Sequence, residues 1–557
     1  MATRRQFISS GMSAAALGLL GKPLYAAVSA CEAPGQTPVG MSDPVQRIST
    51  RNPGQLFGDI RFDRGWTGDR LPHPSLPLVD KAPVPDEFTD VVVVGGGLSG
   101  LASAYLLRDL NPVVLEYHHR FGGQARGETW RGAQYPLGSA YVITPDTGSF
   151  LGNLYTELGM NEAHRFQSGV DDPIEIGGQI LYDFWTGSAK SPEEAAQYKR
   201  FAEVVDSIAF GMYPDIPRPN NGPLQPFIFD MDTRSFKQDI EMRMGGPLPP
   251  LLAGAVQAYC YSSFGAGMEE ISAVGGWNFL AAEEYGRWVL PGGNSFMVRQ
   301  MWDALVKIGQ QTGQHNLRSG AKVVDIRLAQ GGALVTYECL NGDLHTIGAK
   351  KVVVSCPKFV ATYLLHDLEA NPDKLNAFHS LQYRSYVVAN VLLNVPLPRD
   401  HYDVFLIGDD SFPTDYVEAQ AHDSVTDALN GVYAQPSIRQ NGVLSLFYPL
   451  PWDGARFSLV VDTAWEDYAE KLVPQIHEIL NVLNLQRSDV ARVRMTRWGH
   501  AMPIHQHVIA NGIVDQLREP IEDTIYFVEQ DNWALPAVEN CLIDADIYTR
   551  QLRDSLK

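Results

Sequence analysis

A glycine-rich turn between a predicted strand and a predicted helix constrains the fold of this chain more than any other feature. Residues 91–94 are four valines, which predict a buried parallel strand. Gly95, Gly97 and Gly100 follow in a G-x-G-x-x-G pattern. Such glycines permit a tight turn, close approach of a pyrophosphate and close contact of helix and strand. Residues 98–110 suit the helix, whose free N–H groups attract an anion. The candidate contacts to a dinucleotide in this turn are Gly95, Gly97, Leu98, Ser99 and Gly100.

An acidic residue stands where a dinucleotide site requires one. A second predicted strand, residues 113–115, ends in Glu116. Glu116 lies about twenty residues after the first glycine, where a carboxylate accepts hydrogen bonds from a ribose. A glycine-rich turn alone can be purely structural. The strand, the helix and the spaced acid together favour a dinucleotide site.

The residues after Glu116 indicate which dinucleotide is bound. Residues 116–124, EYHHRFGGQ, resemble the E-x-x-x-R-x-G-G-R string of the superfamily of flavin-containing amine oxidases and phytoene desaturases. The resemblance implies that the cofactor is FAD and adds Arg120, Gly122 and Gly123 to its candidate contacts. Gln124 stands where the family usually has arginine. We therefore expect Arg126 to supply the charge beside the pyrophosphate.

Three later segments carry the same resemblance. Residues 130–141 resemble the segment that runs beneath the isoalloxazine ring, although a plain β-turn is an alternative interpretation. Residues 323–326 resemble the strand whose backbone contacts adenine. Residues 524–541 resemble the closing FAD motif, in which N–H groups at a helix start face the flavin pyrimidine oxygen. The contacts implied by these segments are Gly138, Ser139, Val323, Gln530, Asp531, Ala537 and Val538.

The resemblance also implies the domain organisation. We expect an α/β fold with a discontinuous Rossmann-like FAD-binding domain and a mixed α+β substrate domain, as in the amine oxidases. The FAD-binding domain is predicted from residues 87–147, 286–360 and 496–557. The substrate domain is predicted from residues 148–285 and 361–495. Residues 31–86, rich in Pro and Gly, are expected to form an extended arm.

The N-terminal segment resembles an export signal. Residues 1–30 contain Arg4 and Arg5 but no acidic residue, and the apolar run over 7–20 is too short to span a bilayer. They resemble a twin-arginine (Tat) signal, which implies export to the periplasm by the Tat translocase. An ordinary Sec signal or a frayed amphipathic end is the alternative. Residues 28–31 also resemble a lipoprotein processing box, so lipidation of Cys31 would be the one route to a membrane.

The charge of the chain bears on its partners. The formal net charge is −20, and removal of the three cationic residues of 1–30 would make it −20 − 3 = −23. This argues against nucleic acid as a partner. It favours a cationic substrate, although a solvated acidic surface is the commoner explanation. Five cysteines without a C-x-x-C pair give no sign of a disulfide framework or of a metal ribbon.

Four side chains are candidates for the substrate pocket. Amine oxidases of this family often carry a lysine on the strand matching residues 386–393, but here that strand contains Asn390 and no lysine. A quinone or a cytochrome is therefore an alternative to dioxygen as the electron acceptor. Trp498 and Trp533 resemble the aromatic residues that enclose an amine, although core positions are equally compatible. His500 lies near two further histidines in the sequence. For these three residues, packing in the core or a place in the substrate pocket is favoured over binding a metal.

The leading hypothesis from these observations is an exported FAD-dependent oxidoreductase. It would oxidise a small amine, including a polyamine, by hydride transfer from the α-carbon to the flavin. No catalytic acid or base is identifiable in the sequence. One alternative is a desaturase or isomerase acting on an apolar polyene. Another is a non-catalytic FAD-binding partner of a second exported protein.

Overall fold

The computed structural model describes residue 79 and residues 81–557 apart from 170–171, 188–190, 219–220, 315, 340, 398–400, 439 and 462. Of the predicted arm it also describes the backbone of three short strands. The predicted signal, Cys31 and the rest of the arm lie outside the described residues. None of the described helices combines the length and the apolarity needed to span a bilayer.

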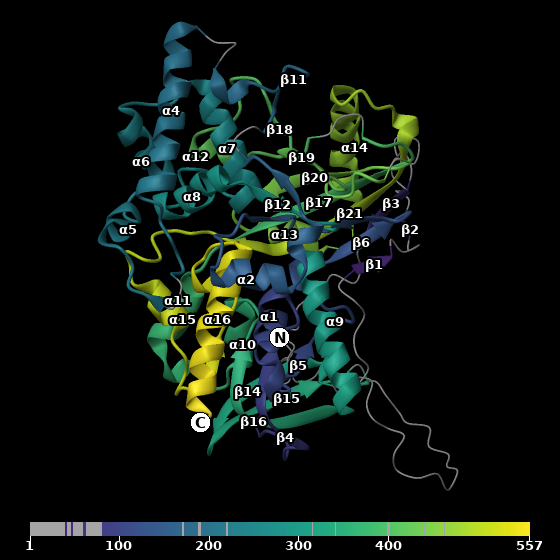
Figure 1. The fold of residues 1–557 in the computed structure, drawn as a ribbon, viewed down its shortest axis with the longest axis vertical. Helices are drawn as coiled ribbons and strands as arrows, with labels where there is room; N and C mark the ends of the chain where they lie inside the picture. Colours follow the sequence, from purple (N-terminus) through teal and green to yellow (C-terminus); the bar gives the residue numbers. More distant parts are fainter. Residues whose placement is uncertain are drawn as a thin grey trace, which may run out of the picture.

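A seven-stranded sheet forms the lower half of the molecule (Figure 1). Its central strands are parallel, and their paired ends are rich in valine, as expected for a sheet covered on both faces. Five of its strands pair in parallel with at least one neighbour, and the other two add an antiparallel extension. In order they are β13 (Leu317–Ser319), β5 (Val113–Glu116), β4 (Glu87–Val94), β16 (Leu344–Val354), β15 (Gly332–Glu338) and β14 (Lys322–Ala329), with β22 (Ile525–Phe527) on β16.

This sheet draws on three separate parts of the chain. Its strands come from residues 87–116, 317–354 and 525–527. The predicted discontinuous Rossmann-like domain is therefore confirmed. The strand predicted at 323–326 is confirmed by β14.

A second, nine-stranded sheet lies above the first. It contains the strand predicted at 386–393. One of its strands, β21, crosses the boundary proposed at 495/496, and the placement of all the domain boundaries stays a prediction. In order the strands are β11 (Gln179–Leu181), β10 (Ile174–Ile176), β18 (Phe405–Gly408), β19 (Asp427–Asn430), β20 (Val443–Leu450), β17 (Tyr383–Leu393), β21 (Val490–Pro503), β3 (Asp59–Phe62) and β2 (Gln46–Arg47).

Two small sheets complete the strands of the described residues. One is formed by β1 (Val39–Met41), β6 (Gly127–Trp130) and β7 (Ala133–Pro136). The other is formed by β8 (Tyr141–Ile143), β12 (Arg287–Val289) and β9 (Arg165–Gln167). Strands β1, β2 and β3 belong to the predicted arm and pair with the body through β6 and β21.

The helices cover both sheets. In Figure 1, α1, α9 and α10 lie beside the lower sheet, and α4, α6, α7 and α8 lie in the upper half. Their bounds are α1 (Leu98–Leu106), α2 (Phe150–Glu157), α3 (Met160–Ala163), α4 (Pro192–Gly211), α5 (Pro226–Met231), α6 (Phe236–Met244), α7 (Pro250–Phe264), α8 (Ala273–Leu280), α9 (Ser295–Thr312), α10 (Lys358–Leu364), α11 (Pro372–Ser380), α12 (Tyr416–Ala419), α13 (Arg456–Val460), α14 (Ala464–Val482), α15 (Ile513–Arg518) and α16 (Val538–Ser555).

Local signals account for several of these helix ends. Ser191 and Glu194 form a reciprocal capping box at the start of α4, in the S-x-x-E pattern typical of such a start. Asn111, in the left-handed conformation, ends the turn that follows α1, next to Pro112. The helix predicted from Ala537 begins at Val538.

One expectation about the cysteines is wrong. Cys339 is disulfide-bonded, although the spacing of the cysteines gave no sign of a disulfide. The reason is that bonds between distant cysteines leave no local pattern. Cys260, Cys356 and Cys541 are free thiols.

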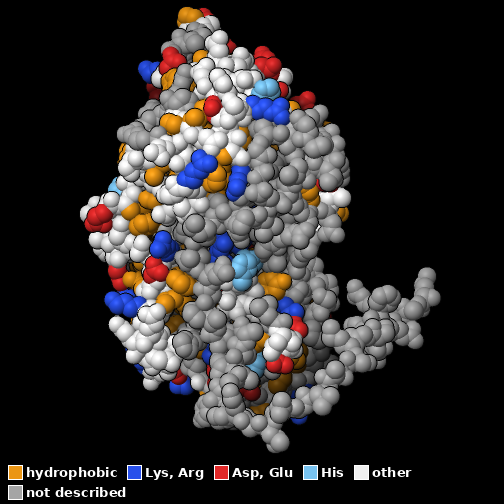
Figure 2. All heavy atoms as spheres, turned by 90° about the vertical axis from the view of Figure 1, so that its right-hand side faces the viewer, with side chains coloured by type: hydrophobic (Ala, Val, Ile, Leu, Met, Phe, Trp, Pro, Cys, Tyr) orange, Lys and Arg blue, Asp and Glu red, His pale blue; other side chains and the backbone are white. Residues whose placement is uncertain are grey.

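The described surface does not present charge of a single sign. On the face shown in Figure 2, acidic and basic side chains are interspersed between apolar ones on the described atoms. The net acidity of the chain is therefore not gathered into one patch on the described part of that face.

Candidate functional site

A cavity of about 800 Å³ is lined by residues of both large sheets. Its lower part borders the glycine turn between β4 and α1, and its upper part borders α7, β17 and β20. The cavity therefore extends from the predicted dinucleotide site into the second domain.

The glycine turn is shaped by contacts that only glycine allows. Gly95 has φ +108°, and a Cβ there would lie 2.7 Å from the carbonyl oxygen of Ser355. A Cβ on Gly100 would lie 1.9 Å from the carbonyl oxygen of Gly95. Gly95, Gly97, Leu98 and Ser99 line the cavity, whereas Gly100 lies behind the turn. Helix α1 starts with no side-chain cap, so its first N–H groups are left for an anion.

Glu116 stands at the cavity end of β5. Its Oε2 accepts a hydrogen bond from the Gly96 N–H at 2.6 Å, and its Oε1 accepts one from the His118 N–H at 2.7 Å. Burial raises the pKa of Glu116, and these two bonds act in the opposite direction. The carboxylate is thus fixed at the cavity wall, and each oxygen has a further lone pair for a ribose hydroxyl.

The residues that follow form one side of the cavity. Arg126 is buried, and its Nε donates to the Gly123 carbonyl at 3.0 Å. The Nε2 of Gln124 donates to the His500 carbonyl at 3.2 Å. Arg120, Gly123, Gln124 and Arg126 line the cavity, whereas Gly122 does not. Gly123 faces Gly97 so closely that a Cβ on it would lie 3.1 Å from the Cα of Gly97, and bare backbone without side chains therefore forms this part of the cavity wall, where a phosphate would lie.

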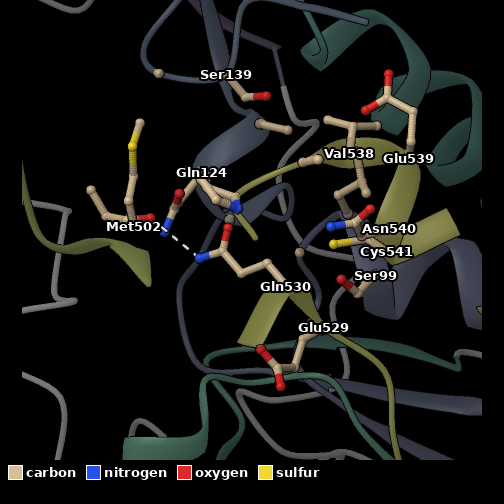
Figure 3. Close-up of a pocket in the computed structure, with 18 of the residues that line it drawn as sticks. Ser99, Gln124, Ser139, Met502, Glu529, Gln530, Val538, Glu539, Asn540 and Cys541 are labelled. Atoms are coloured by element: carbon tan, nitrogen blue, oxygen red, sulfur yellow. Dashed lines mark hydrogen bonds between the residues drawn. The ribbon is translucent and has the colours of Figure 1, made fainter. Parts of the chain in front are cut away.

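The C-terminal segment forms the opposite side (Figure 3). The side chain of Gln530 points toward Gln124, and its Nε2 donates to the Ala501 carbonyl at 3.2 Å. Ala537 and Val538 line the cavity at the start of α16, which has no side-chain cap. Gly138, Ser139 and Val323 also line it. The residues implied by the four separate segments therefore surround one space.

Asp531 lies outside this lining. It is fully buried, and its Oδ2 accepts bonds from the Lys358 N–H at 2.8 Å and from the Tyr383 hydroxyl at 2.5 Å. We therefore reassign Asp531 from a cofactor contact to a residue that orders the turn after β22. The backbone turns between Glu529 and Asp531. As a result, Glu529 lines the cavity, whereas Asp531 is buried outside its lining.

Glu529 and Lys358 were missed by sequence reasoning. Glu529 lines the cavity and forms an ion pair with the buried Nζ of Lys358, which also donates to Asn532 Oδ1 at 2.6 Å. Burial and the nearby Asp531 raise the pKa of Glu529 to about 8. A buried lysine just after a strand has no sequence signature. The acid-rich turn at 529–531 was the one available signal.

Two of the four pocket candidates lie at the cavity. The indole of Trp498 lines it and donates to the Leu137 carbonyl at 3.0 Å. A Cβ on Gly138 would lie 3.4 Å from that indole, so the glycine lets the ring pack against the 138–139 backbone. The His500 ring stacks on Phe359 with centroids 3.7 Å apart, and both line the cavity.

The other two candidates are buried elsewhere. The Oδ1 of Asn390 accepts a bond from the Ser445 hydroxyl at 2.5 Å, and neither residue lines the cavity. The Trp533 indole lies 3.4 Å from Asp544 Oδ1, away from the cavity. Strand β17 reaches the cavity through Tyr386 and Val388 instead, because Asn390 lies further along the strand. These two residues replace Asn390 as candidates.

The upper cavity contains an acidic wall. The hydroxyl groups of Tyr259 and Tyr141 donate to Glu283 Oε1 at 2.9 and 3.2 Å. Arg287 donates to Glu283 Oε2 at 2.5 Å. Aromatic residues surround this wall, namely Tyr213, Phe279, Tyr285, Tyr386 and Phe447.

The histidines near 500 are dispersed. His505 is fully buried, and its ring nitrogens contact the Trp533 carbonyl at 2.8 Å and Asp232 Oδ1 at 3.0 Å. No group of His, Cys, Asp and Glu suited to a metal is found among the described residues. His505 therefore has a structural role in connecting three segments.

Comparisons with known proteins agree on one family. A family model described as flavin containing amine oxidoreductase matches residues 98–526. The oxidoreductase PigB of Serratia sp. (strain ATCC 39006) is 21% identical over 552 residues, which cover 88% of this chain and 79% of that protein. A putrescine oxidase structure bound to putrescine superposes with a TM-score of 0.60 at 17% identity, over 84% of this chain and 99% of the other. A fatty acid isomerase from P. acnes superposes with a TM-score of 0.59 at 12% identity, over 83% and 98%.

Proposed function

The chain belongs to the family of flavin-containing amine oxidoreductases, and we propose that it oxidises small amines. It is an FAD-dependent oxidoreductase. The residues present fit FAD: an open glycine cradle and an uncapped helix for the pyrophosphate, and Glu116 for a ribose. When bound, the flavin accepts a hydride from the substrate.

The observation that carries the amine proposal is the composition of the upper cavity. Trp498, Tyr386 and Phe447 provide aromatic faces, which attract cations as well as apolar groups. Glu283 adds a carboxylate to the same wall. In this arrangement the chain positions the amine and excludes water, two contributions that orient the substrate for oxidation.

The test is reduction of the flavin in the purified holoprotein without oxygen. We expect putrescine or cyclohexylamine to bleach the flavin absorbance, with 1-butanol and cyclohexanol as matched controls that lack the amine. Bleaching by neither amine would overturn the proposal. Turnover of an unsaturated fatty acid or polyene would then support the alternative isomerase or desaturase, which the aromatic lining also suits. A flavin that stays oxidised with every compound would support a non-catalytic partner protein.

The same experiment can identify the electron acceptor, because the bleached flavin must be reoxidised. Strand β17 carries no lysine, so we propose that a quinone or a cytochrome serves as acceptor in place of dioxygen. A soluble quinone should reoxidise the bleached flavin faster than air-saturated buffer does. Faster recovery in air would identify an oxidase.

We also propose that the protein is exported, as the N-terminal segment suggests. The disulfide at Cys339 supports this, because disulfides persist in oxidising compartments.

Mass spectrometry of protein from the periplasmic fraction of a bacterial host tests the export proposal. We expect Cys339 in a peptide pair that separates on reduction. Cys260, Cys356 and Cys541 serve as internal controls, because they should be alkylated without reduction after denaturation. Protein confined to the cytoplasm, or Cys339 alkylated without reduction, would contradict the proposal.

A further inference from the structure

Four carboxyl groups lie around a single guanidinium beside the upper cavity. Asp172, Glu283, Asp403 and Asp427 are each at most 4% exposed, and Arg287 is 1% exposed. Arg287 contacts Asp172 at 2.7 Å, Glu283 at 2.5 Å and Asp403 at 3.7 Å. One cation cannot compensate four buried carboxylates, and burial raises the pKa values of Asp172, Asp403 and Asp427.

Two members of the cluster accept hydrogen bonds from hydroxyl groups that line the cavity. They differ in how many of their acceptor positions are already occupied. Glu283 already accepts bonds from two tyrosines and from Arg287. Asp427 accepts one, from the Ser262 hydroxyl to its Oδ2 at 2.9 Å. Its Oδ1 is buried with no hydrogen-bond partner among the described residues. Asp427 is thus the member with room to take up a proton.

The sheet register places Asp427 on the cavity side. Asp427 pairs with Phe447 on the adjacent strand β20, and Phe447 pairs with Val388 on β17. Residues paired directly across antiparallel strands share a face. Phe447 and Val388 both line the cavity, as does Ser262 on α7. The Ser262 hydroxyl therefore connects the cavity to the Asp427 carboxyl.

We propose that Ser262 and Asp427 remove the proton that an ammonium substrate must lose before oxidation. This inference rests on the proposed amine oxidation, because only a neutral amine has the free electron pair that assists hydride loss. An N–H bond of the ammonium breaks and its electron pair stays on nitrogen. The proton passes to Ser262 Oγ, while the original hydroxyl proton passes to Asp427 Oδ2. An ammonium and a carboxylate become an amine and a carboxylic acid.

The surroundings of Asp427 set the pH range of this step. Burial raises its pKa to about 8, while the bond from Ser262 and the charge of Arg287 act to lower it. Asp172 and Asp403 face it as further acids, and the hydroxyl groups of Tyr386 and Tyr402 lie nearby. The acceptor is the ionised form, so the rate of deprotonation should rise as pH increases through 8.

Anaerobic flavin reduction by cyclohexylamine between pH 6 and 10 tests the proposal. In Ser262→Ala we expect a rate about 100-fold below wild type at pH 8, where about half of Asp427 is ionised, as for loss of proton transfer. The two rates should converge near pH 10, because free amine becomes abundant near the pKa of an alkylammonium, about 10.4 for the lysine side chain. Ser263→Ala removes a neighbouring cavity hydroxyl and should keep the wild-type pH profile. A defect of equal size at every pH would overturn the proposal.

A second measurement needs no turnover. tert-Butylamine has no α-hydrogen and cannot be oxidised, so its binding isolates the proton transfer. Infrared difference spectra of the holoprotein at pH 9 should show a protonated carboxyl band on binding in wild type, and no such band in Asp427→Asn. A band that persists in Asp427→Asn assigns the proton to another acid and overturns the proposal. If cyclohexylamine leaves the wild-type flavin oxidised while tert-butylamine still gives the band, amine oxidation fails and the proton acceptor stands.

Discussion

Gly100→Ala is expected to yield protein that carries no FAD. The added Cβ would lie 1.9 Å from the carbonyl oxygen of Gly95, a backbone atom of the turn that would hold the pyrophosphate, and the backbone of α1 fixes the position of that Cβ. No side-chain rotation relieves such a contact. The turn must open, which displaces the N–H groups of α1 from the phosphate position. The ratio of flavin to protein absorbance after purification measures the effect.

Gly246→Ala is the matched control for this substitution. Gly246 has no positive φ, and a Cβ there would meet no atom within 4 Å. This variant should retain FAD at the wild-type ratio. Full flavin occupancy in Gly100→Ala would show that the turn tolerates a wider opening than its packing indicates.

Arg287→Met is expected to destabilise the protein by about 3–5 kcal/mol, as for removal of one partner from a buried ion pair. Arg287 is the cation shared by Asp172, Glu283 and Asp403. In this variant the buried carboxyl groups must either stay protonated or carry a negative charge that the lost guanidinium no longer compensates. The destabilisation should shrink as pH falls, because protonation of these acids removes the uncompensated charge. Urea unfolding at pH 5 and pH 8 measures both effects.

Arg299→Met provides the comparison for this variant. Arg299 pairs with Asp303 on the exposed side of α9 at 3.4 Å, with both side chains nearly half exposed. Exposed pairs contribute about 0.2–1 kcal/mol. Equal losses in the two variants would mean that the acid cluster does not depend on its single guanidinium.

The parts of the site that could be predicted from the sequence are those encoded by neighbouring residues. The glycine turn, Glu116 and the capping box of α4 each depend on spacings within one segment. Asn390 failed as a pocket candidate because strand alternation fixes the face of a residue but not its distance along the strand from a cavity.

Other parts depend on contacts between distant segments. The acid cluster combines residues 172, 283, 403 and 427, which come from four separate segments of the chain and show no common period. Asp531 and Glu529 lie two residues apart, and their separate roles follow from Lys358, about 170 positions earlier. Contacts between residues so far apart in the chain leave no local sequence pattern. The sequence alone could therefore not assign the roles of these residues.

The chain order of the lower sheet also determines when the cofactor can be enclosed. The glycine turn is made before β22 and α16, which close the opposite side of the cavity. Domains that fold as units generally do so when their sequence is complete. A nascent chain therefore exposes a half-built cofactor site until β22 and α16 have been made, and loss of the segment that contains Ala537 and Val538 would leave FAD without its second wall.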